Sequence, residues 1–145
     1  MTRGTRIALV VAGFMVAGSV PTIIGYVRAY RDRGKVSRGM SLTSVFGTVE
    51  GWNLCINSYL DESTAEFGTF SIAKDPGAPT YRAAKYDKTM YSKEEFVQFI
   101  GQQMNNGKSW NSQFTYVAGP VRNTFRVDFD ANGRVVNVSG MGGGP

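Results

Sequence analysis

The sequence predicts an α+β protein in which an N-terminal transmembrane helix is followed by a small antiparallel sheet packed on two helices. Three observations predict this fold: a long uncharged segment near the start, helical spacing of apolar residues in two later segments, and alternation of apolar and polar residues in several others. The hydrophobic fraction of 42% is sufficient for a packed core. We expect an anchor with a basic linker over residues 1–40, one α+β domain over 41–139, and a flexible glycine-rich tail over 140–145.

The uncharged segment from Ile7 to Val27 is the predicted membrane anchor. A helix over these residues would be about 30 Å long, which matches the hydrocarbon core of a bilayer. The alternative is a cleaved signal peptide, with a cleavage site at Ala17, Gly18 and Ser19. We favour a retained, single-pass signal anchor because the apolar character continues beyond that site and basic residues follow directly.

A cluster of five basic residues, named here the basic collar, follows the anchor: Arg28, Arg31, Arg33, Lys35 and Arg38. We expect the collar to face the membrane surface and its lipid head groups. Only Arg3 and Arg6 precede the anchor, so the excess of positive charge after it favours a cytoplasmic domain, with the periplasm as the alternative. Small residues four apart, such as Ala8 and Ala12, suggest a homo-oligomer formed through the transmembrane helix.

Two segments of the domain show helical spacing of apolar residues. A helix over Ser41–Glu50 begins with a serine that can cap its first turn. A second helix over Lys93–Asn105 begins with a capping box formed by Ser92 and Glu95. The apolar stripe of the second helix is typical of a side packed on a protein core.

Strands are predicted where apolar and polar residues alternate or where β-branched and aromatic residues gather. The predicted strands are Trp52–Leu60, Phe67–Ala73, Thr80–Tyr86, Phe114–Ala118, Thr124–Phe129 and Arg134–Ser139. The first segment also fits a helix, because Trp52, Ile56 and Tyr59 would share one helical side. We favour the strand, which gives the domain an antiparallel sheet.

Composition excludes several classes of function. The chain has no histidine and one cysteine, Cys55, which excludes histidine-dependent triads, histidine zinc sites and intrachain disulfides. Residues 1–40 carry seven basic residues and one acid, whereas residues 41–145 carry nine basic and ten acidic residues. The domain thus has a net charge of −1, and we expect no nucleic-acid partner. We also expect no enzymatic activity, no catalytic residue and no cofactor.

One motif is compatible with metal binding. Residues Asp128 to Gly133 read D-x-D-x-N-G, like the first half of an EF-hand calcium loop. The last position of such a loop is a glutamate, whereas this chain has Ser139, and the flanking residues alternate as strands do. We therefore interpret the motif as a hairpin turn and predict no metal site.

Two stretches of the sequence resemble the BamE/SmpA-like domain family of outer-membrane assembly lipoproteins. Gly39-Met40, followed by capping hydroxyl residues and a helix that ends near Gly51, is similar to the opening helix of that family. The stretch from Phe125 to Val136 is similar to its closing hairpin. The resemblance implies a small helix-and-sheet domain that scaffolds other proteins in an envelope complex, on the periplasmic side. The chain departs from the family because no lipidation cysteine lies near residue 20.

Two functional hypotheses follow. The first is a membrane-anchored, non-enzymatic interaction or assembly module whose partners are the lipid bilayer and other membrane or envelope proteins. The alternative is a membrane-tethered small-ligand-binding domain with a pocket between sheet and helices. Six aromatic residues are candidates to line that pocket or to contact a partner: Trp52, Tyr81, Tyr86, Tyr91, Trp110 and Tyr116.

Overall fold

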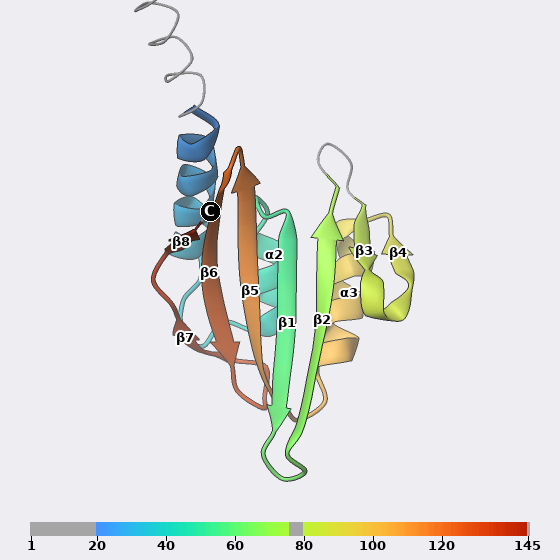
Figure 1. Ribbon diagram of the computed structural model, residues 1–145. Helices are drawn as coiled ribbons and strands as arrows, with labels where there is room; N and C mark the ends of the chain where they lie inside the picture. Colours follow the sequence, from blue (N-terminus) through green and yellow to red (C-terminus); the bar gives the residue numbers. More distant parts are fainter. Residues whose placement is uncertain (1–19, 76–79, 145) are drawn as a thin grey trace, which may run out of the picture.

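The computed structural model describes residues 20–75 and 80–144 and shows one antiparallel sheet with helices against it (Figure 1). The chain enters through a helix over residues 20–34, named here the N-terminal helix. The other elements follow in the order α2 (Leu42–Thr48), β1 (Leu54–Asp61), β2 (Glu66–Lys74), β3 (Tyr81–Ala83), the 3₁₀ turn η1 (Ala84–Tyr86), β4 (Lys88–Met90), α3 (Lys93–Met104), β5 (Ser109–Ala118), β6 (Val121–Phe129), β7 (Val135–Val138) and β8 (Gly142–Gly144).

The sheet has eight strands in the order β4-β3-β2-β1-β5-β6-β7, and β8 pairs with β6 on the edge where β7 also pairs. One series of elements, a helix followed by three strands, occurs twice in the chain. Helix α2 is followed by β1, β2 and β3, which extend from the centre to one side, and α3 is followed by β5, β6 and β7, which extend to the other. The two units meet at the antiparallel β1–β5 pair, where Cys55 lies opposite Phe114. The sequence itself shows no repeat.

The helices of the described residues pack on the same face of the sheet. Phe46 of α2 packs against Phe114 of β5, with ring centroids 5.3 Å apart, and against Phe96 of α3 at 5.7 Å. Asp32 of the N-terminal helix accepts a hydrogen bond from Tyr116, two residues after Phe114 on β5. Residues two apart on a strand point to the same side, so Phe114 and Tyr116 both face the helices.

The prediction of a transmembrane helix over Ile7–Val27 was wrong, and the predicted single-pass membrane localisation is corrected with it. Among the described residues, no helix combines the length and the apolar character that crossing a bilayer requires. Residues 7–19 of the predicted span lie outside the described residues. The N-terminal helix covers residues 20–34, and its Ala29 and Asp32 are completely buried against the sheet. The sequence was misleading because an uncharged run that extends to Val27 does not reveal that the helix side carrying Gly25 and Ala29 packs on the protein's own sheet.

The expected fold class is corrected in the same way. A transmembrane helix with a small sheet on two helices is replaced by an eight-stranded sheet covered by α2, α3 and the N-terminal helix. The two helices expected in the domain are present as α2 and α3. Strands β4 and β8 were not expected. Strand β8 lies within the glycine-rich segment 140–145, which was expected to be a flexible tail.

Candidate functional site

Four of the six candidate aromatic residues fill the space between the sheet and the helices. Trp52, Tyr81, Trp110 and Tyr116 are each no more than 4% exposed. Trp52 lies 5.6 Å from the ring of Phe96 on α3, and Tyr81 stacks on the same ring at 4.3 Å. These rings occupy the place where the sequence suggested a ligand pocket, and their role in the structure is to form the core.

The other two candidate aromatics lie at the β3–β4 edge. Tyr86 is 39% exposed and its ring packs edge-on against Phe70 and Phe99, at 5.4 and 5.5 Å. Tyr91 lies between β4 and α3 and is 73% exposed. The structure therefore does not bring the six candidates together into one site.

The basic collar contacts the protein itself. Arg33 donates from Nε to the carbonyl oxygen of Ser139 at 2.7 Å, and Arg38 donates from Nε to that of Val136 at 2.8 Å. These bonds join the end of the N-terminal helix and the following loop to β7 and the residue after it. Several of the charges that suggested lipid head groups are thus placed where they hold the N-terminal segment on the domain.

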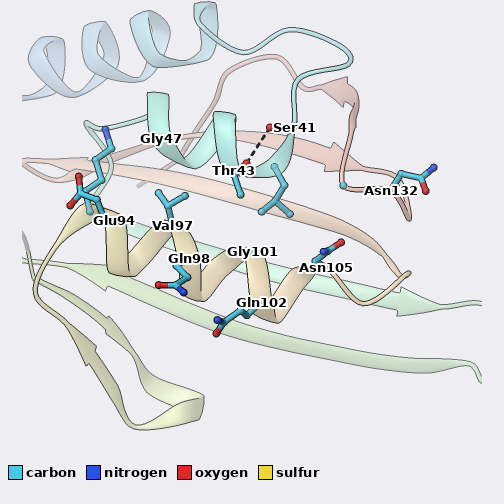
Figure 2. A pocket seen from close by; sticks show the side chains of 13 residues that line it. Ser41, Thr43, Gly47, Glu94, Val97, Gln98, Gly101, Gln102, Asn105 and Asn132 are labelled. Atoms are coloured by element: carbon cyan, nitrogen blue, oxygen red, sulfur yellow. Dashed lines mark hydrogen bonds between the residues drawn. The ribbon is translucent and has the colours of Figure 1, made fainter.

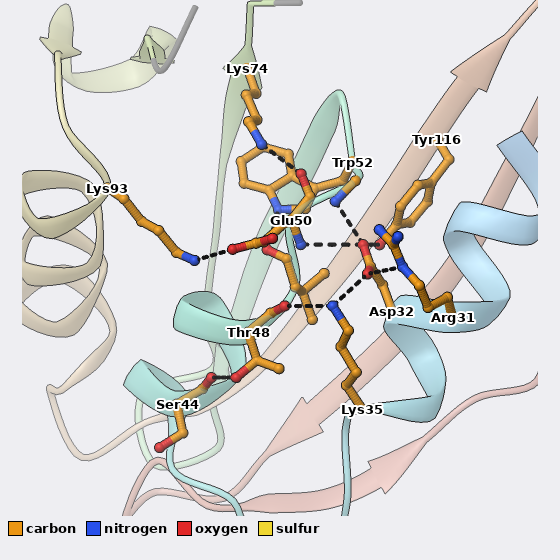
Figure 3. A network of polar contacts seen from close by, with 12 residues as sticks. Arg31, Asp32, Lys35, Ser44, Thr48, Glu50, Trp52, Lys74, Lys93 and Tyr116 are labelled. Atoms are coloured by element: carbon orange, nitrogen blue, oxygen red, sulfur yellow. Dashed lines mark hydrogen bonds and ion pairs between the residues drawn. The ribbon is translucent and has the colours of Figure 1, made fainter. Parts of the chain in front are cut away.

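A buried carboxylate, Asp32, fixes the N-terminal helix to the domain (Figure 3). Its Oδ2 accepts hydrogen bonds from the backbone N–H groups of Gly51 and Glu50, at 2.6 and 3.2 Å, and from the Tyr116 hydroxyl at 3.0 Å. Its Oδ1 lies 3.3 Å from Nζ of Lys35. Burial alone would raise the pKa of Asp32, but the hydrogen bonds from Gly51, Tyr116 and Glu50 outweigh it and lower that pKa below its ordinary value.

Asp32 was not among the residues expected to form a site. The one available signal is that Asp32 is the only acidic residue among the first forty. Its burial depends on Gly51 and Tyr116, which are 19 and 84 positions away in the sequence. Local pattern carries no information about contacts of that range.

The same polar network continues to α3. Glu50, which follows α2, pairs through Oε1 with Nζ of Lys93 at 2.6 Å, and its carbonyl oxygen accepts from Nζ of Lys74 at 2.5 Å. Figure 3 shows these contacts between α2, β2 and the start of α3. The ion pair with Lys93 lowers the pKa of Glu50. The network joins structural elements and uses charges that would otherwise be candidates for acid–base chemistry.

The single cysteine lies in the core. Cys55 has no exposed surface, and its thiol lies 3.5 Å from Oδ1 of Asn57, which also accepts from the Ser112 hydroxyl at 2.7 Å. Burial raises the pKa of the Cys55 thiol far above its usual range, and the contact with Asn57 only partly opposes this. A buried, protonated thiol is a poor nucleophile.

An open groove of about 800 Å³ lies between α2, α3 and the β6–β7 turn (Figure 2). Gly47, Val97 and Gly101 line it, and the two glycines carry no side chain that could project into the groove. Amide side chains line its rim: Gln98, Gln102, Asn105 and Asn132. The groove is on the solvent side of the helices, so it differs from the pocket between sheet and helices that the sequence suggested.

The opposite face of the sheet, named here the bare face, is covered by no element of the described residues. Its side chains on the four central strands are mostly hydroxyls, amides and short aliphatic groups, of which Thr115 alone is buried, at 5% exposure: Leu54, Ile56 and Ser58 on β1, Thr69, Ser71 and Ala73 on β2, Asn111, Gln113 and Thr115 on β5, and Thr124, Arg126 and Asp128 on β6. The register aligns them in rows, one of which is Ser71, Ile56, Gln113 and Arg126. The sequence signal for this face is the polar half of each alternation.

The bare face is nearly neutral and becomes apolar at one end. Nε of Arg126 lies 3.0 Å from Oδ1 of its neighbour Asp128, so these two charges compensate each other. Leu60 and Phe67, which pair across β1 and β2, are 51% and 68% exposed. A surface with hydrogen-bonding groups in the middle and exposed apolar side chains at its end resembles the surfaces on which proteins associate.

Comparisons with known proteins do not assign the chain to a family: no family model, no curated protein and no solved structure matches it. The resemblance of two short stretches to BamE/SmpA-like domains stays a prediction. The function is therefore inferred from the geometry of the chain itself.

Proposed function

We propose that this protein is a non-enzymatic interaction module that docks a protein partner on the bare face of its sheet. The observation that supports the proposal is the contrast between the two faces. One is covered by helices and filled with aromatic rings, whereas the other presents hydroxyl, amide and aliphatic side chains to solvent in regular rows.

The dimensions of the bare face suit a protein better than a small molecule. Four strands of eight to ten residues, spaced about 4.8 Å apart, give a flat area of roughly 20 Å by 27 Å, or about 540 Å². This area is of the same order as the roughly 800 Å² of accessible surface that each partner buries in a standard protein interface. The domain from residue 41 onwards has a net charge of −1, which disfavours the phosphate backbone of nucleic acids as the partner.

The placement of the reactive side chains supports a non-enzymatic role. Cys55 is buried, and Asp32 and Glu50 are engaged in contacts that hold helices in place. The described residues contain no group of three or more cysteine, aspartate or glutamate side chains arranged to hold a metal ion. The interaction role requires none of these chemistries.

Affinity capture with a matched pair of variants tests the proposal. Gln113→Arg places a large charged side chain in the centre of the bare face, and Gln98→Arg makes the same change on the exposed side of α3. We expect the wild-type chain and Gln98→Arg to capture the same partners from the source cells, identified by mass spectrometry, and Gln113→Arg to lose them. Equal capture by both variants, or no reproducible partner for the wild-type chain, would contradict the proposal.

The groove beside α3 supports a second candidate, a small-ligand-binding domain. A volume of about 800 Å³ with an amide rim is in the range of ligand sites. Here Gln98→Arg is the informative variant. Ligand binding at the groove predicts chemical-shift changes of Gly47, Val97 and Gly101 amides on addition of a fragment library, abolished by Gln98→Arg. Shifts confined to bare-face residues would exclude this candidate.

A further inference from the structure

The N-terminal helix carries an apolar stripe on the side that faces away from the domain. The stripe consists of Val20, Ile23, Ile24, Val27 and Tyr30, whose exposed fractions are between 44% and 62%. At 100° per residue these positions span about 120° of the helix circumference. A continuous exposed stripe of this kind differs from scattered surface apolar residues and indicates a contact site.

The opposite side of the helix is fixed to the domain, so the stripe has a defined direction. Gly25, Ala29 and Asp32 are buried there. At Gly25 the helix approaches the β5–β6 end so closely that a Cβ atom would lie 2.8 Å from Cβ of Ala118. Asp32 adds the hydrogen bonds to Gly51 and Tyr116. The stripe cannot turn inwards without loss of these contacts.

The spacing of the stripe suits another helix. Val20, Ile23, Val27 and Tyr30 are separated by three, four and three positions, the spacing of the core positions in a two-helix coiled coil. It is also symmetric about Gly25: Ile23 and Val27 lie two residues from it, and Val20 and Tyr30 lie five residues from it. An antiparallel copy of the same helix would therefore place each of these side chains opposite another member of the stripe.

We propose that the occupant of this stripe is a second copy of the chain, packed antiparallel, with Ile23 of each copy against Val27 of the other and Val20 against Tyr30. The charges of the helix favour this orientation. Residues 20–27 carry no charge, whereas Arg28, Arg31 and Arg33 follow. A parallel pair would bring these arginines of both copies together, and an antiparallel pair separates them to opposite ends. The dimer leaves the bare face free.

The test is the oligomeric state of the full chain, measured by sedimentation velocity over a concentration series. We expect a reversible dimer for the wild-type chain. Val27→Glu should raise the dimer dissociation constant at least about a hundredfold, because two unpaired carboxylates would enter an apolar interface. Tyr91→Glu, an equally drastic change at a residue 73% exposed near the other edge of the sheet, should leave it unchanged. Circular dichroism controls the fold of each variant, and Ile23→Glu serves as an independent second variant.

Mixing two variants tests the orientation. Ile23→Glu and Val27→Lys should each be monomeric alone and should form a heterodimer when mixed, because an antiparallel pair places the new opposite charges together. No heterodimer on mixing would overturn the antiparallel arrangement.

A monomeric wild-type chain, or a Val27→Glu variant as dimeric as the wild type, would overturn the proposal of a dimer. A monomer that binds uncharged lipid vesicles through the stripe would also overturn it. Partner capture by the bare face is a separate readout that Val27→Glu should not change.

Discussion

The two units of the sheet have the same order of elements but different sources of stability. The N-terminal half is α2 with β1, β2 and β3, and the C-terminal half is α3 with β5, β6 and β7. In the C-terminal half, α3 has 12 residues, a serine cap and four buried apolar residues at helical spacing. In the N-terminal half, α2 has only 7 residues, which is too short to be stable without tertiary contacts. The comparison shows that one topology can be specified by local signals in one half and by distant contacts in the other.

The distant contacts of the N-terminal half come from the N-terminal helix. Asp32 binds the backbone at Glu50 and Gly51, in the connection between α2 and β1. The corresponding connection between α3 and β5 is closed locally, since Asn106 Oδ1 accepts from the backbone of Lys108 and from the indole N–H of Trp110. The shorter helix therefore depends on a residue outside its own half, and four substitutions test this difference.

The largest effect is expected from Phe114→Ala, which removes a ring shared by both halves. Phe114 has no exposed surface and contacts Phe46, Trp52 and Phe125 at 5.2 to 6.1 Å between ring centroids. We expect a loss of about 3–5 kcal/mol in the free energy of unfolding, measured by urea denaturation, with one cooperative transition.

Val117→Ala, at a residue of β5 that is 48% exposed, is the control and should cost less than about 1 kcal/mol. Two separate transitions in Phe114→Ala would show that the halves do not share a core.

An intermediate effect is expected from Asp32→Asn, which keeps the size of the side chain but removes its charge. The charged hydrogen bonds to Gly51 and Tyr116 weaken, and we expect a loss of about 2–3 kcal/mol at neutral pH. The folded-state pKa of Asp32 lies below its ordinary value of 3.8, so the contribution of the carboxylate is fully present above pH 3.8 and is lost as the pH falls through the folded-state pKa.

Urea denaturation of both proteins as a function of pH measures this. The difference between wild type and Asp32→Asn should be constant above pH 3.8 and decrease at lower pH. A difference that grows on acidification would mean that Asp32 is destabilising in the folded state.

The smallest effects are expected from the two helix caps. The hydroxyls of Ser41 and Ser92 each accept a backbone N–H at 3.1 Å, from Ser44 and Glu95. Ser41→Ala and Ser92→Ala should therefore each cost about 1 kcal/mol in unfolding free energy although the helices differ in length. A cost at Ser41 more than twice that at Ser92 would show that the contacts of its hydroxyl with Thr43 and Ser44 contribute independently.

Local signals predicted the C-terminal half well. The helix expected over Lys93–Asn105 is observed as Lys93–Met104. The prediction was close because the residues that cap this helix, form its apolar stripe and end it all lie within fifteen positions. The turn from Asp130 to Gly133 joins β6 and β7 as expected, with Oδ1 of Asp130 accepting from the backbone of Asn132 and Gly133 at φ 69°. Such features need no information from the rest of the chain.

Features that depend on distant contacts could not be predicted in this way. The uncharged run that ends at Val27 is compatible both with a bilayer span and with a helix packed on a sheet through Gly25 and Ala29. The close approach of Gly25 to Ala118 that distinguishes them joins distant positions. The bare face was missed for a related reason. Alternation predicted which residues of Phe67–Ala73 point to opposite sides, but only the position of the helices decides which side remains uncovered.

The pairing of β8 has a consequence for solubility. The edge of β6 that faces away from β5 is divided between two short strands. Strand β7 pairs with Val127 to Phe129, and β8 pairs with Arg122 to Thr124. Backbone from residues 39–41 further covers β7, since the N–H of Gly39 donates to Val135 and the carbonyl of Met40 accepts from it. A long central strand therefore offers no continuous template for pairing with another sheet. The glycines of β8, which have no side chains to pack, thus protect this edge of the sheet from fibrous aggregation.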